Sequence, residues 1–263
     1  MEIPASWIWL CLSALAAGIV NSLAGGGTLL TFPTLMAALS PLGTAEAAVV
    51  ANATSTVALV PGSLAAAWGY RREVAAARRW LVILSGPSIL GGIVGSLLVT
   101  RLDPRYFSAL VPWLLFLAAV IFLADTLLAR YRSRDAGPRT TTPAGVVGLI
   151  LFQFGVAVYG GYFGAGIGIL MLSSLAMMGV GDIHRMNALK TLLNGMINGV
   201  SVVVFVADKK VDWSCALPMA VSAILGGYLG ARAALLVRPK QVRWGVIAIA
   251  FGLAVYYFAR GQS

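Results

Sequence analysis

The chain has 263 residues, of which 59% are hydrophobic and only 11% are charged, and its mean hydropathy is +0.89. Because a soluble domain is about half apolar and about a quarter charged, this composition excludes a soluble fold and indicates a polytopic membrane protein. The net charge of +10 comes from short clusters of Lys and Arg between apolar runs, the pattern that sets membrane orientation. Nucleic-acid binding would need a basic patch on a soluble module, so no nucleic acid is expected as a partner.

Two of the apolar stretches are too long for one membrane span. The first, Trp7–Leu39, is interrupted by Gly25-Gly26-Gly27-Thr28, and three stretches of ordinary span length follow it: Ala45–Trp68, Trp80–Thr100 and Tyr106–Leu128. The order then repeats. The second overlong stretch, Ala144–Met178, is interrupted at Gly164–Gly168, and three stretches follow it: Asn187–Ala207, Trp213–Val237 and Val242–Phe258. Because glycine runs cost backbone entropy, each overlong stretch is predicted to be a helix, a break and a second, shorter helix.

Short motifs recur at fixed offsets along the chain. Ile89-Leu90-Gly91-Gly92-x-x-Gly95 returns in the second half as Ile224-Leu225-Gly226-Gly227-x-x-Gly230, and Pro104 returns as Pro239 with the same offset. Gly25 and Gly27 return as Gly164 and Gly166 with a slightly larger offset. We therefore predict an all-α polytopic membrane protein of two repeats, 1–129 and 144–263, joined by a cytoplasmic linker, 130–143. Each repeat is a broken or re-entrant helical hairpin followed by three transmembrane helices.

The positive charges favour repeats of inverted topology. If each broken segment is a hairpin that returns to its starting side, the inside loops carry 13 Lys and Arg and the outside loops carry 5. If each broken segment crosses once, the two halves are parallel and the numbers are 11 and 7. Since Lys and Arg gather on the cytoplasmic side, the inverted arrangement is predicted, with both termini outside. Inverted repeats with interrupted helices are a recurrent plan of transporters.

The breaks are the first candidate for a binding site, because irregular backbone at membrane depth needs protein or a watery cavity to satisfy it. Amides at the amino ends of the short helices would attract an anion. The predicted site residues here are Asn21, Gly25, Gly26, Gly27 and Thr28 in the first half and Gly164 and Gly166 in the second. Alternatively, the glycines only allow close helix packing, and we favour that role for Gly91, Gly95, Gly226 and Gly230.

Polar residues on two helices are the second candidate. Lys190, Asn194 and Asn198 recur once per helical turn and share one helix face. The helix from Ala45 carries an analogous polar face that includes Asn52 and Thr56, and the repeat offset relates Asn52 to Thr191 and Ser55 to Asn194. Polar residues inside membrane helices usually face a pathway. Two alternatives stay open: Lys190 extends to the headgroups, or the asparagines only bind neighbouring helices.

The scarcity of acidic residues within the spans favours an anionic substrate over a cation, although proton coupling through Glu46 or Asp182 stays open. An enzyme is not expected. The single histidine, His184, excludes metal sites built on paired histidines, and no G-x-S-x-G nucleophile elbow occurs. We expect no cofactor and no metal.

Two motif pairs resemble a known family. The segment from Gly18 to Pro33 with Ala51-Asn52-Ala53-Thr54, and the later Gly161-Tyr162-Phe163-Gly164-Ala165-Gly166-Ile167-Gly168 with Asn187–Asn194, are similar to the two repeats of the sulfite exporter TauE/SafE family. This family is also called the toluene-sulfonate uptake permeases. The resemblance implies transport of a sulfur oxyanion or organic anion, such as sulfite, thiosulfate or sulfoacetate, across the bacterial inner membrane.

The sequence thus predicts a multi-pass secondary transporter in the bacterial inner membrane, with the lipid bilayer and a small anion as its partners. An uncoupled anion channel and, third, a membrane protein without transport are the alternatives. The substrate, the direction, the coupling ion and a homo-oligomeric state stay open.

Overall fold

A computed structural model of the chain describes residues 5–23, 26–69, 78–128, 143–177, 183–233 and 239–260, and these form helices and short turns without a strand. The first half contains α1 (Ala5–Leu23), α2 (Thr28–Ala38), the short 3-10 helix η1 (Ser40–Leu42), α3 (Thr44–Gly69), α5 (Arg78–Arg101) and α6 (Pro104–Leu128). The second half contains α7 (Pro143–Tyr162), α8 (Ile167–Met177), α9 (Ile183–Ala207), α10 (Trp213–Ala233) and α11 (Pro239–Arg260). The predicted all-helical class is confirmed.

Local chemistry explains several of the helix boundaries. Prolines open α6, α7 and α11 at a position where the missing amide and the fixed φ of proline suit a helix start. Asp212 stands just before α10 and accepts a hydrogen bond from the amide of Cys215 at 3.1 Å, which is the geometry of a helix cap. Short sequence signals therefore set where these helices begin.

Both overlong stretches are split at the predicted glycines. Between α1 and α2, Gly26 has a φ of +94°, and between α7 and α8, Gly164 and Gly166 have φ of +80° and +79°. Residues with a Cβ rarely adopt this left-handed region. Gly25, which the sequence also placed in the break, lies outside the described residues.

Within the described ranges, six helices are long and apolar enough to cross a membrane, namely α3, α5, α6, α7, α9 and α10. Large apolar side chains on their outer faces are exposed, including Val82, Trp113, Leu151, Val203 and Leu217. Such an apolar surface is suited to lipid contact. The fold therefore has the dimensions and composition of a multi-pass membrane protein.

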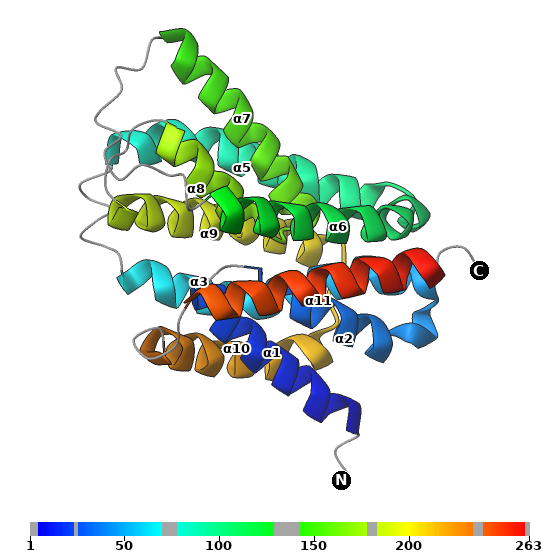
Figure 1. Cartoon of the computed structure of the whole chain (residues 1–263). Coiled ribbons are helices and arrows are strands. Elements are labelled where there is room, and N and C mark those ends of the chain that lie inside the picture. The colour runs from blue at the N-terminus through cyan, green and yellow to red at the C-terminus, as the bar shows by residue number, and fades with distance from the viewer. Residues whose placement is uncertain are drawn as a thin grey trace.

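The helices gather in two groups that each draw on both halves of the chain (Figure 1). In one group α1, α2, α3 and α10 pack together, and in the other α5, α7, α8 and α9 do so. Helices α6 and α11 pack along each other, and α3 contacts α9 between the groups. Each half thus places its broken segment in one group and a later helix, α5 or α10, in the other.

Equivalent glycines make equivalent close contacts in the two groups. A Cβ at Gly91 of α5 would lie 2.7 Å from the carbonyl oxygen of Phe154 in α7, and a Cβ at Gly226 of α10 would lie 2.0 Å from that of Leu15 in α1. Gly91 is related to Gly226, and Leu15 to Phe154, by the two offsets of the sequence repeat. These backbone contacts confirm the packing role predicted for Gly91 and Gly226.

Two ion pairs show which helix ends lie together. Arg101, at the end of α5, lies 2.9 Å from Asp208, just after α9. Lys210 lies 2.7 Å from Glu46, in the first turn of α3. The carboxyl ends of α5 and α9 and the amino end of α3 therefore meet, and we call this end of the molecule the Arg101 end.

Candidate functional site

The two glycine breaks lie against one aromatic ring, that of Phe122 in α6. Cε2 of Phe122 lies 3.0 Å from the Cβ position of Gly26 and 3.5 Å from that of Gly166. The two Cβ positions are therefore no farther apart than the sum of these distances. The ring is 0% exposed. The breaks, one from each half of the chain, thus meet around a ring that neither broken segment supplies.

The second break is also tied to α3. The side-chain amide of Asn52, which is 1% exposed, donates from Nδ2 to the carbonyl oxygen of Tyr162 at 3.0 Å. One turn later the Thr56 hydroxyl donates to the Asn52 carbonyl at 2.8 Å. Because the Tyr162 carbonyl can only accept, Nδ2 must point to it. Oδ1 of Asn52 is then a buried acceptor without a hydrogen-bond partner among the described residues.

Lys190 lies along the first turn of α8. Its Cδ, Cγ and Cε atoms are 3.3, 3.7 and 3.8 Å from the Cβ position of Gly168. The ammonium, one bond beyond Cε, is therefore near the amino end of α8, where the helix dipole is positive. The Lys190 side chain and the positive end of the α8 dipole thus lie close together at the second break.

Some of the amides at the breaks are already used. In α2 the amides of Leu29 and Leu30 donate to the carbonyls of Gly26 and Gly27 at 3.1 and 3.0 Å, and in α8 the amide of Ile169 donates to Gly166 at 3.1 Å. The helix dipoles remain, but fewer N–H donors are open than the sequence suggested. Two backbone amides come before these donors in the sequence at each break: those of Gly27 and Thr28 at the first, and those of Ile167 and Gly168 at the second.

The remaining predicted residues bond near their own helices. Asn21 of α1 donates to the Ser63 hydroxyl of α3 at 3.3 Å, and Asn198 donates to Asn194 at 3.3 Å along α9. Thr28 offers its carbonyl to the Thr31 hydroxyl at 3.5 Å. Of the predicted residues, the structure thus brings Gly26, Gly166, Asn52 and Lys190 together at the breaks, whereas it joins Asn194 and Asn198 to each other.

Sequence reasoning missed Phe122, the side chain that contacts both breaks. One signal was available: the offset that relates Pro104 to Pro239 also relates Phe122 to another aromatic residue, Tyr257. The Tyr159 hydroxyl donates to the carbonyl oxygen of Ala165 at 2.7 Å, and this hydrogen bond stabilises the second break.

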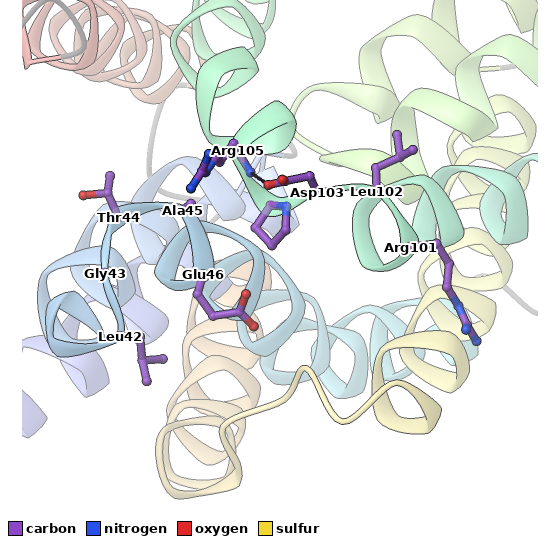
Figure 2. Close-up of a pocket in the computed structure, with 10 residues that line it drawn as sticks. Leu42, Gly43, Thr44, Ala45, Glu46, Arg101, Leu102, Asp103 and Arg105 are labelled. Carbon is purple, nitrogen blue, oxygen red and sulfur yellow. Dashed lines mark hydrogen bonds between the residues drawn. The ribbon is translucent and has the colours of Figure 1, made fainter.

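A cavity of about 650 Å³ opens at the Arg101 end between the starts of α3 and α6. Figure 2 shows Arg105 beside Thr44 and Ala45, with its backbone amide bonded to the carboxylate of Asp103 at 2.9 Å. A second cavity of about 870 Å³ shares Arg105 and is lined further by aromatic residues of α6 and α11, among them Trp113 and Tyr257. Lys190 lines neither of these two cavities.

Asp212, just before α10, has a perturbed pKa. Burial alone would raise the pKa of this carboxyl, but hydrogen bonds from the Ser214 hydroxyl and from the amides of Cys215 and Ser214 outweigh it and hold the pKa below its usual value. No cluster of three or more His, Cys, Asp or Glu side chains that could bind a metal occurs in the described part of the chain.

Comparison with known proteins identifies relatives over nearly the whole chain. The family model described as Sulfite exporter TauE/SafE matches residues 10–257. A probable membrane transporter protein of Haemophilus influenzae is 25% identical over 238 residues, covering 89% of this chain and 88% of the relative. The probable membrane transporter protein YfcA of Escherichia coli K12 is 27% identical over 259 residues, covering 95% and 89%. The probable membrane transporter protein ORF9 of a Sinorhizobium species is 27% identical over 253 residues, covering 95% and 92%. No solved structure shows a significant match.

Proposed function

We propose that this chain, which belongs to the sulfite exporter TauE/SafE family, is a permease that moves a small anion across the bacterial inner membrane by secondary transport. The anion is a sulfur oxyanion or an organosulfonate of the sulfite, thiosulfate or sulfoacetate type. The relatives carry the name of probable membrane transporters, which supports transport. We expect no catalysis, and the partners are the substrate anion and the lipid bilayer, with a homo-oligomer left open.

The observation that carries the proposal is the position of Lys190 against Gly168 at the start of α8. A lysine ammonium and the positive end of a helix both attract an anion, and this attraction is stronger in a medium of low dielectric constant than in water. The amides of Ile167 and Gly168 would donate to the oxygens of the anion, in the way that helix amino ends bind phosphate or sulfate. Charged hydrogen bonds of this kind are strong.

The ion pairs at the Arg101 end support the inverted arrangement of the repeats. If the halves were parallel, α5 and α9 would run in opposite directions and end on opposite sides of the membrane. Arg101 and Asp208, at the carboxyl ends of these helices, are instead 2.9 Å apart. Together with the charge bias of the loops, this contact supports a topology in which the Arg101 end faces the periplasm.

The test is anion flux in proteoliposomes that contain the purified protein. Labelled sulfite, thiosulfate and sulfoacetate are offered with and without a proton gradient, and liposomes without protein are the control. We expect saturable flux of at least one of these anions that responds to the gradient. Flux that ignores every ion gradient would favour the uncoupled channel, and the absence of both flux and binding for the whole panel would refute the proposal.

A further inference from the structure

The geometry points to Phe122 as the gate of the anion site between the two breaks, on the side away from the Arg101 end. This inference rests on the proposed transport function. Helix α6 starts at Pro104, and at a rise of about 1.5 Å per residue Phe122 lies about 27 Å along it. Its ring contacts Gly26 and Gly166, one glycine from each break.

The ring fills space that two absent side chains leave open. A Cβ at Gly26 would lie 2.6 Å from Cζ of Phe122, closer than real Cβ contacts allow. The positive φ of Gly26 and Gly166 disfavours side chains at both positions. The fully buried ring therefore occludes the space between the breaks, and an anion can pass them on this side only when the ring moves away. Rotation of one aromatic side chain, with a small shift of α6, is enough for such a movement.

The residue at the equivalent place in the second half lies in a different setting. Tyr257 of α11, which the repeat offset relates to Phe122, packs against Phe32 of α2 with ring centres 6.3 Å apart and lines the cavity of about 870 Å³. One aromatic residue of the pair is thus enclosed between the breaks, and the other borders open space. Such inequality between equivalent positions is what alternating access by two related halves requires.

Two separate observations thus define the gate, the closed contact at Phe122 and the open space beside Tyr257.

The test uses thiol accessibility at the second break, which does not depend on transport. In full-length protein with Cys11→Ser and Cys215→Ser, Ala165→Cys places a thiol at a residue that is 0% exposed between Gly164 and Gly166. An anionic methanethiosulfonate reagent is added to proteoliposomes, and the labelling rate is measured.

With Phe122 in place we expect the thiol to react slowly, and with Phe122→Ala at least about tenfold faster, because the open state becomes the populated one. Phe122→Leu, which keeps most of the apolar volume, should give an intermediate labelling rate. This variant keeps the test decisive if the alanine variant does not fold. Phe205→Ala is the matched control: it removes another ring that is 0% exposed, in α9, and should leave the labelling rate unchanged.

Anion flux is measured on the same samples. Phe122→Ala should raise net flux above that of the parent, and Phe122→Trp, with a larger ring, should lower it. Labelling that is equally slow in the alanine and leucine variants, or equally fast in Phe205→Ala, would overturn the gate. If labelling changes as expected while the parent moves no anion of the panel, the gate stands as a feature of the fold and the proposed substrate class is refuted.

Discussion

Replacing Lys190 by methionine removes the ammonium and keeps a stem of similar length along Gly168. The ammonium lies one bond beyond a Cε that is 3.8 Å from the Cβ position of Gly168. For an anion held by the first amides of α8 we take a separation of about 4 Å from the charge, the distance of a close ion pair. At an effective dielectric constant of about 20, two unit charges at about 4 Å attract by about 4 kcal/mol.

Desolvation of the ammonium and the anion offsets part of this attraction. If about half remains, the loss of about 2 kcal/mol raises the KM for the anion by about 30-fold. We expect Lys190→Met to show this rise in KM when proteoliposome flux is measured. Lys190→Arg keeps the charge but not the shape, so its KM should lie between that of the parent and that of Lys190→Met. Lys209→Met, at an exposed loop position, is the control and should keep the parent KM. A KM for Lys190→Met equal to that of the control would refute the placement of the anion beside α8.

Three further predictions concern stability, measured as thermal unfolding in detergent or nanodiscs. Gly226→Ala should destabilise the protein by about 1–3 kcal/mol, because its Cβ would lie 2.0 Å from the Leu15 carbonyl, whereas Gly227→Ala meets nothing within 4 Å and should not destabilise it. Asp212→Ala should cost about 1 kcal/mol near neutral pH by removing the cap of α10. Because the folded pKa of Asp212 is lowered, its contribution is present above its unfolded pKa of about 3.9 and is lost as the pH falls below that; equal stability of parent and variant at neutral pH would contradict this. Glu46→Lys should lose at most about 1 kcal/mol because the pair with Lys210 is partly exposed, and adding Lys210→Glu should restore it.

The glycine breaks are a feature of the fold that a few consecutive residues are enough to predict. A run of glycines inside an apolar stretch longer than one span predicts a helix, a turn and a helix, and the positive φ of Gly26, Gly164 and Gly166 confirms that prediction. The helix starts at Pro104 and Pro239 have a similarly local cause, although the apolar stretches placed these starts at Tyr106 and Val242. These features depend on backbone entropy and sterics within a few residues, so they are readable from a single chain.

The hydrogen-bond partners of Asn52 and Asn194 are a feature that local sequence does not predict. Their spacing placed both on polar helix faces of the two repeats, and periodicity treats them alike. In the structure Asn52 donates to the carbonyl of Tyr162 at the second break, whereas Asn194 accepts from Asn198 along its own helix. Which partner an amide finds depends on the rotation and tilt of neighbouring helices, and no local pattern encodes these.

Sequence by itself determined that this chain belongs in a bilayer and where its helices are interrupted, and it predicted that the two halves are repeats, because hydropathy, glycine content and spacing are properties of consecutive residues. Only the tertiary structure decided that the Phe122 ring lies between the breaks, that the Lys190 stem follows the start of α8, and that Arg101 meets Asp208. Those contacts join residues from different helices, in part from opposite halves of the chain. Their formation depends on how whole helices pack, which is a balance of shape and charge summed over the entire fold.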